Sequence, residues 1–193
     1  MKQILLSICL LTLASSVNAG ETAKANHEAE IIEAKKAIKE FAGALQTELK
    51  TAMQAGGPVA AIAVCNVRAM PITEKIAAEK GMQLSRVSLK NRNPVNAPND
   101  WQAAVIQDFE KQKMSGKDVA SLAWSETVDG DDGREFRFMK AIPTAAVCLN
   151  CHGTSIAPEV SQALTNLYPK DLATGYSEGD IRGAFVVTRK VSD

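Results

Sequence analysis

The segment Cys148-Leu149-Asn150-Cys151-His152 is the feature that most limits what this chain can fold around. Two cysteines separated by two residues lie on one helical turn, where each thiol can add to a vinyl group of a porphyrin. The histidine directly after the second cysteine then reaches the iron at the centre of that ring. The pattern predicts one covalently attached haem c, with Cys148 and Cys151 as attachment points and His152 as the proximal ligand.

Two other kinds of site also use paired cysteines. A redox-active disulfide usually opens a helix in a thioredoxin-like βαβ unit, whereas this motif lies late in the chain with no βαβ pattern around it. Zinc needs a fourth ligand beyond Cys148, Cys151 and His152, and Cys65 could supply it. The zinc and thiol-redox alternatives stay open, although export and the Cys-His adjacency favour haem.

Residues 1–19 predict a secretory signal peptide with cleavage before Gly20. A short positive start precedes an apolar run from Ile4 to Val17, and small residues follow at the spacing of a signal peptidase site. The mature chain, residues 20–193, is then expected in a bacterial periplasm. No other stretch approaches transmembrane length, so no transmembrane segment is expected in the mature chain.

The mature chain predicts a single α+β domain in which helices precede an antiparallel sheet. Apolar residues at helical spacing predict helices over 20–55, 69–80, 101–113 and 161–168, with Gly81 as a helix cap. Alternating patterns predict strands over 82–89, 120–128, 134–142 and 181–190. Residues 59–67 suit either a short helix or a strand. A hairpin before the motif and a strand after it do not fit the helical cytochromes, but suit a PAS-like sheet.

The sixth iron ligand has several candidates. His27 is the only histidine besides His152, and it lies near the start of the mature chain. Methionine can bind haem iron but more often fills a core. Cys65 is the thiol left without a cysteine partner, and a free cysteine is often a small buried hydrophobe. The residues alone leave His27, Cys65 and the methionines open; the methionines are Met53, Met70, Met82, Met114 and Met139.

Three segments resemble the Tll0287-like haem domain family. They are Ala63-Val64-Cys65-Asn66, the run from Arg86 to Pro98 (RVSLKNRNPVNAP), and Cys148 to His152. The resemblance extends over roughly Ile31 to Lys190, nearly the whole mature chain. It implies a PAS-like fold with one c-type haem whose axial ligands are histidine and cysteine, here His152 and Cys65. It also implies a redox-sensing, gas-sensing or electron-transfer role.

Thiolate ligation would have consequences for function. An anionic sulfur stabilises ferric iron, so a low reduction potential is expected. Loss of the sulfur ligand on reduction would open a position for carbon monoxide or nitric oxide, which is a sensing mechanism with redox state as its input. Arg86 and Arg92 are candidates for binding the haem propionates, because guanidinium groups match carboxylates. The alternative is that they form a solvated basic face.

A haem enzyme of the peroxidase or nitrite type is the alternative function. Such chemistry usually needs a distal acid–base group, and only His27 is available besides the proximal ligand. The 22 basic and 22 acidic residues balance, which gives no support for nucleic-acid binding. The chain contains no kinase, cyclase or methyl-accepting region, so a sensor or carrier would act through a separate signalling or redox protein partner.

Overall fold

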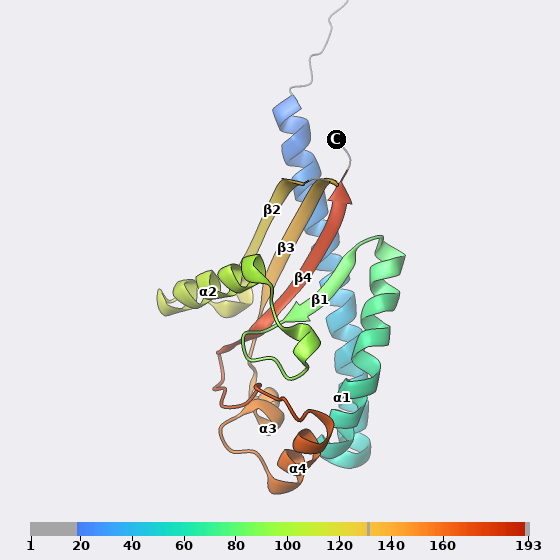
Figure 1. Cartoon of the computed structure of the whole chain (residues 1–193), viewed down its shortest axis with the longest axis vertical. Coiled ribbons are helices and arrows are strands. Elements are labelled where there is room, and N and C mark those ends of the chain that lie inside the picture. Colours follow the sequence, from blue (N-terminus) through green and yellow to red (C-terminus); the bar gives the residue numbers. More distant parts are fainter. Residues whose placement is uncertain (1–18, 131, 192–193) are drawn as a thin grey trace, which may run out of the picture.

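The computed structural model describes residues 19–130 and 132–191. Figure 1 shows a four-stranded sheet with a long helix, α1 (Ala19–Lys80), on one face and a shorter helix, α2 (Asp100–Met114), on the other. Residues 1–18 of the predicted signal peptide lie outside the described residues. The α+β class, the single domain and the N-terminal helix are confirmed, whereas the PAS-like comparison stays a prediction.

Helix α1 consists of two antiparallel segments joined at Gly56 and Gly57, which have non-helical backbone angles. Ion pairs link the segments: Lys80 Nζ lies 3.0 Å from Glu40 Oε2, and Arg68 Nη2 lies 3.4 Å from Glu48 Oε1. The first segment matches the helix predicted over residues 20–55.

The second segment of α1 differs from the prediction. It is helical from residue 58 to residue 80, so the ambiguous stretch 59–67 is helix and no break precedes the helix predicted over 69–80. Proline is accepted in the first helical turn, where its missing N–H is not needed, and Pro58 therefore begins this segment instead of only ending the previous one. Gly81 has φ +61° and ends the helix, as predicted, with Met82 N–H donating to the Ala77 carbonyl at 3.1 Å.

The sheet has the order β1-β4-β3-β2, and every pair is antiparallel. Strands β2 and β3 form the predicted hairpin, and the last strand of the chain lies between β1 and β3. All four predicted strands are confirmed to within a few residues; they are β1 (Gln83–Val87), β2 (Ala123–Gly130), β3 (Gly133–Pro143) and β4 (Ile181–Val191).

Each face of the sheet buries its own core. On the α1 face, Phe136, Phe138 and Val187 pack with Phe41 and Ile76 of the helix. On the α2 face, Val186 and Met139 pack with Ile106 and Phe109, and the Trp101 and Trp124 rings stack nearby with centroids 5.7 Å apart. Successive side chains of β4 point alternately into the two cores, so the strand needs apolar residues on both faces. This explains its continuous apolar run.

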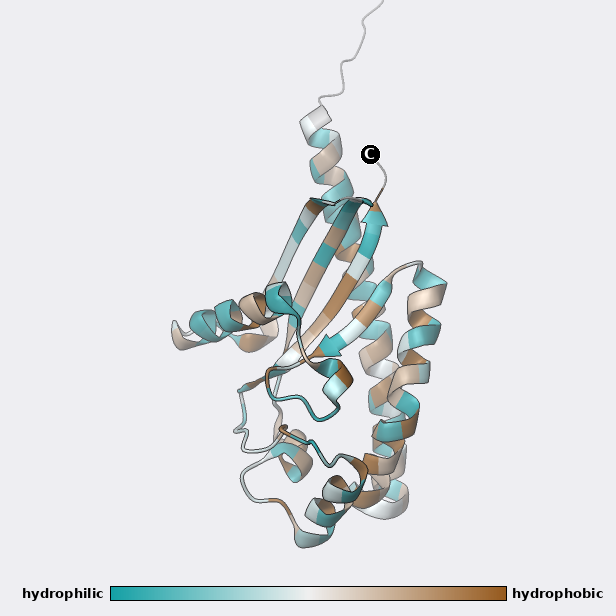
Figure 2. Cartoon of the chain, in the orientation of Figure 1, coloured by the Kyte–Doolittle hydropathy of each residue, from teal (hydrophilic) through white to brown (hydrophobic). Residues whose placement is uncertain are grey.

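The chain between β3 and β4 forms a separate lobe beyond the end of the sheet. It contains the 3₁₀ turn η3 (Ala146–Cys148), the short helix α3 (Leu149–His152) and α4 (Pro158–Leu167). Val160 and Leu164 of α4 pack against Ile62 in the second segment of α1. Figure 2 shows apolar residues where this part of α1 meets the lobe. Two further 3₁₀ turns are η1 (Pro94–Asn96), in the predicted 91–100 loop, and η2 (Val119–Ser121).

Within the described residues, one helix, Gly20–Lys80, is long and apolar enough to cross a membrane. Length and composition alone support that statement, and a helix of a globular domain passes the same test. The absence of a transmembrane segment in the mature chain therefore stays a prediction.

Candidate functional site

The predicted helical turn carries Cys148, Cys151 and His152 as expected, because η3 leads directly into α3. Gly153 ends this turn, and its N–H donates to the Leu149 carbonyl at 3.0 Å. A Cβ at residue 153 would lie 2.6 Å from that carbonyl oxygen, so the tight exit from the turn needs glycine. Two backbone hydrogen bonds of 2.9 Å, from Gly175 N to Gly153 O and from Tyr176 N to His152 O, hold the turn against the chain that follows α4.

The His152 ring is fixed in one orientation. Its Nδ1 lies 2.7 Å from the carbonyl oxygen of Ala173, which can only accept, so Nδ1 carries the proton and Nε2 keeps its lone pair. Burial, followed by the positive charges of Arg182 and Arg92, lowers the pKa of His152 to about 3. The ring is therefore neutral near pH 7, which is the form that binds a metal.

Arg92 holds this turn in place through contacts within the protein. Its Nε lies 2.9 Å from Asp171 Oδ2, and its Nη2 donates to the Cys151 carbonyl at 2.5 Å and to the Ala173 carbonyl at 3.3 Å. Asp171 also accepts from Ala173 N–H at 2.7 Å. Arg92 is thus paired with a carboxylate of its own chain. Its guanidinium group would have to make the predicted propionate contact in addition to these hydrogen bonds.

Cys65 and Arg86 reach the same region from other elements. Cys65 lies one helical turn after Ile62, and Ile62 belongs to the apolar cluster against which Cys151 and Tyr168 pack. Burial raises the pKa of the Cys65 thiol, while the positive charges of Arg86 and Arg92 lower it. Arg86, on β1, lies over the Phe41 ring at 5.3 Å, and burial lowers the pKa of its guanidinium. The structure therefore brings the predicted site residues to one end of the sheet.

The other candidates for an axial ligand lie elsewhere or are occupied. His27 Nε2 lies 3.0 Å from Ser125 Oγ and its Nδ1 lies 3.2 Å from Thr127 Oγ1, and both partners belong to β2, the first strand of the hairpin. Met82 and Met139 are buried in the two cores. Met70 and Met114 are 48% and 78% exposed, and Met53 is half-buried.

The zinc alternative needs four side chains around one point. In the part of the chain that the structure describes, no group of three or more His, Cys, Asp and Glu side chains could hold a metal ion. Cys65 therefore does not complete a compact cluster with Cys148, Cys151 and His152.

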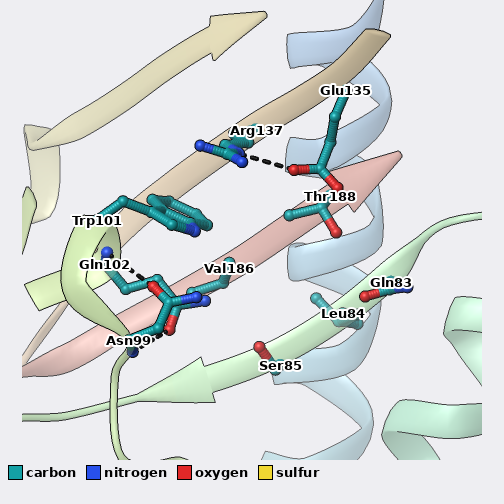
Figure 3. A pocket seen from close by; sticks show the side chains of 10 residues that line it. All are labelled: Gln83, Leu84, Ser85, Asn99, Trp101, Gln102, Glu135, Arg137, Val186 and Thr188. Atoms are coloured by element: carbon teal, nitrogen blue, oxygen red, sulfur yellow. Dashed lines mark hydrogen bonds and ion pairs between the residues drawn. The ribbon is translucent and has the colours of Figure 1, made fainter. Parts of the chain in front are cut away.

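Two cavities lie away from the motif. One, of about 350 Å³, opens on the sheet beside the start of α2 and contains the ion pair of Arg137 and Glu135, with Trp101 at its edge (Figure 3). The other, of about 490 Å³, lies between the start of α1 and the strands, with His27 in its wall. Neither is lined by Cys65, Cys148, Cys151 or His152.

The donor set around α3 fits a haem. Two thiols lie on one turn, a neutral imidazole offers Nε2, and a third thiol comes from another helix. One buried guanidinium nitrogen, Arg182 Nε, has no hydrogen-bond partner in the part of the chain that the structure describes. Arg182, Tyr176 and Asp171 belong to none of the motifs identified in the sequence, although a glycine inside a strand, here Gly183, is a signal of a bulge.

Comparisons with known proteins agree with this arrangement. The family model described as Tll0287-like matches residues 21–189. The crystal structure of the cyanobacterial haem protein Tll0287 is similar, with a TM-score of 0.58 and 25% sequence identity over 92% of this chain and 99% of that one. A comparison with curated proteins found no match. Because the family model covers most of its length, this chain belongs to the Tll0287-like family.

Proposed function

We propose that this chain is an exported protein that binds one c-type haem through Cys148 and Cys151, with His152 and Cys65 as axial ligands. The observation that carries the proposal is the hydrogen bond between His152 Nδ1 and the Ala173 carbonyl, because it leaves Nε2 unprotonated on a Cys-x-x-Cys-His turn. The haem of the similar protein Tll0287 supports the same cofactor here.

Cys65 is the best candidate for the second axial ligand. It projects from the helix whose neighbouring turn packs with Cys151. Met82 and Met139 lie in the cores, Met70 and Met114 are exposed, and His27 is hydrogen-bonded to β2. Burial raises the pKa of the Cys65 thiol on balance, and the positive charges of Arg86 and Arg92 offset only part of this cost. Without a metal the thiol form is therefore favoured, and the two arginines lessen the cost of forming the thiolate at an iron.

The role that we propose is redox sensing or low-potential electron transfer. When bound, a haem supplies one-electron chemistry and a position for a diatomic gas if an axial ligand leaves. The chain's own residues hold the imidazole neutral and keep a thiol in a half-buried place where its protonation state depends on nearby charge. Enzymatic peroxidase or nitrite chemistry is less well supported, because His27 is hydrogen-bonded to Ser125 and Thr127 of β2.

Absorption spectra of ferric and ferrous protein, with wild type beside Cys65→Ala, test the ligand set. We expect a sulfur-to-iron charge-transfer band and a shifted Soret peak in ferric wild type, both lost in the variant. Met114→Ala, at a methionine that is 78% exposed, is a control that should leave the spectra unchanged. Identical wild-type and Cys65→Ala spectra would overturn Cys65 ligation, and a haem that acid acetone extracts would overturn covalent attachment.

A further inference from the structure

Strand β4 begins with an irregularity at Arg182. In the pairing with β3, Gly183 lies opposite Ile142 and Ile181 lies opposite Pro143, so Arg182 is an extra residue with no partner position. Such a β-bulge changes the direction of a side chain and is frequent beside functional sites. Gly183 makes the bulge possible, since it has φ +155° and a Cβ there would collide with the Val87 carbonyl.

The Arg182 side chain is only partly satisfied by the protein. Nη1 donates to Ser88 Oγ at 3.2 Å and to the Lys90 carbonyl at 3.4 Å, both long hydrogen bonds. Its guanidinium lies 5.3 Å from the centre of the Tyr176 ring. Nε is buried and has no hydrogen-bond partner among the described residues, which is unfavourable for a polar group and more so for a charged one.

Tyr176 connects Arg182 to the candidate iron ligand. The Tyr176 ring meets the His152 ring edge to face, with centroids 6.3 Å apart and an interplanar angle of 89°. Arg182 is also the largest electrostatic contribution to the lowered pKa of His152 after burial. Arg182 therefore lies at the margin of the place where a ring bound by His152 would be.

The charges in this region do not balance. Arg92 has Asp171 as its carboxylate partner, but neither Arg86 nor Arg182 forms an ion pair within the described residues. Burial lowers the pKa of both unpaired guanidinium groups, and the arginines repel one another. Charges withdrawn from water are normally paired in proteins, because an uncompensated charge there is unfavourable. A bound anion would compensate these positive charges, because the described residues provide no carboxylate for Arg86 or Arg182.

We propose that Arg182 is a propionate-binding residue of the haem site and that its buried Nε is the donor which a haem carboxylate satisfies. The assignment rests on the proposed function and extends it to a residue outside the attachment motif. A guanidinium suits this task because its fixed fork matches a carboxylate, and the bulge at the start of β4 is what presents it. The arginines then have different roles. Arg92 stabilises the turn that carries Cys148, Cys151 and His152 (the attachment turn), and Arg182 binds a carboxylate of the cofactor.

Binding of two porphyrins tests the assignment. The full chain with Cys148→Ala and Cys151→Ala is titrated with haemin and with haemin dimethyl ester, which lacks the carboxylate charges. With Arg182 present we expect haemin to bind at least about tenfold more tightly than the ester, as a charge-assisted hydrogen bond predicts. Arg182→Gln should remove most of this preference. Arg182→Lys keeps the charge without the fork and should retain a reduced preference.

The control is Arg189→Gln on the same strand. Arg189 is bonded to Glu30 at 3.0 Å and to the Lys80 carbonyl at 2.6 Å, away from the attachment turn, so this variant should keep the full preference for haemin. In the covalent holoprotein, Arg182→Gln should also lower the reduction potential, because removing a nearby positive charge favours ferric iron, whereas Arg189→Gln should not. A merely structural role for Arg182 would not move the preference between the two porphyrins.

The outcomes separate this assignment from the proposed function. Equal affinities for haemin and its ester, or an unchanged preference in Arg182→Gln, would overturn Arg182 as a propionate-binding residue while haem binding itself stands. If the cysteine variants bind neither porphyrin, the reduction potentials of the covalent holoproteins decide, and equal potentials for wild type and Arg182→Gln overturn the assignment. If the wild-type chain carries no haem when it is expressed with a haem-attachment system, the proposed function fails and this assignment fails with it.

Discussion

His152 Nδ1 lies 2.7 Å from the carbonyl oxygen of Ala173, a residue with no exposed surface. Arg92 Nη2 donates to the same carbonyl oxygen at 3.3 Å. The imidazole is therefore oriented by a backbone group that is itself held in place. Such outer contacts of a metal-binding histidine fix its tautomer and increase its basicity toward the metal.

Haem-free protein, made as Cys148→Ala/Cys151→Ala, should show the lowered pKa of His152 directly. The folded protein favours the neutral ring, so protonation of His152 does not reduce stability above its pKa in the unfolded chain, near 6.5. As the pH falls from there toward about 3, the unfolded chain binds a proton that the folded protein does not, and the free energy of unfolding decreases. The free energy of unfolding should fall by up to about 1.4 kcal/mol per pH unit in this interval. Urea titrations between pH 7 and pH 3 measure it.

His152→Asn keeps an N–H donor for Ala173 and has no titrating ring, so it should flatten this part of the pH profile. An NMR titration that gives His152 its ordinary pKa of about 6.5 would show that the ring is not buried and oriented as described.

The ion pair between Arg92 and Asp171 should be important for stability. Both side chains are nearly covered, at 13% and 11% exposure, and Arg92 also supports Cys151. Removing one partner leaves the other charge buried, so Asp171→Ala should lower the free energy of unfolding of the holoprotein by about 3–5 kcal/mol. Guanidinium denaturation followed by Soret absorbance measures the change.

The exposed pair of Lys75 and Glu79 serves as a comparison, since its side chains are 75% and 50% exposed. Glu79→Ala should change stability by less than about 1 kcal/mol. Equal effects for Asp171→Ala and Glu79→Ala would mean that the Arg92–Asp171 pair does not hold the turn.

Much of this fold could be predicted from the sequence, because its elements have strong local signals. The apolar alternation of 134–142 and 181–190 and the glycine-rich turn between 128 and 134 predict the strands and the hairpin that the structure has. The second segment of α1 was less clear, since Pro58 and Pro71 both count against a helix in isolation. Packing of Ile62 and Ile76 against distant elements decides the outcome, and that information is not local.

The candidate site was predictable only in part. Cys148, Cys151 and His152 form a contiguous motif, and Cys65 stood out as an unpaired thiol. Arg182 carries no comparable signal, because its proposed role depends on a bulge between β3 and β4 and on the ring of Tyr176. The charge of Arg92 marks it as a candidate in the sequence, but its partner Asp171 lies far along the chain, so the ion pair cannot be identified without the fold.

Gly153 should be essential for a correctly formed attachment turn. A Cβ at this position would lie 2.6 Å from the Leu149 carbonyl oxygen, which accepts the hydrogen bond that closes the turn. Gly153→Ala must therefore shift the backbone next to His152, and we expect incomplete haem attachment and a loss of about 1–3 kcal/mol of stability. The ratio of haem to protein and the thermal midpoint measure both effects.

Gly43→Ala is the matched change, because nothing lies within 4 Å of the added methyl in the middle of a helix. It should leave attachment complete and stabilise the protein by about 0.5–1 kcal/mol. Full attachment in Gly153→Ala would contradict the close approach of Gly153 to Leu149.

Carbon monoxide binding should distinguish a sensor from a plain electron carrier. If Cys65 is the axial ligand, its burial favours the neutral thiol, while the charges of Arg86 and Arg92 favour the thiolate. Reduction removes one positive charge from the metal and weakens the hold on an anionic sulfur, so the neutral thiol should become the preferred form of Cys65. We expect ferrous wild type to bind carbon monoxide slowly and Cys65→Ala to bind it without that delay.

Flash photolysis and stopped-flow mixing measure both rates. Ferrous wild type that stays six-coordinate and refuses carbon monoxide would exclude ligand loss and leave electron transfer as the role of this site.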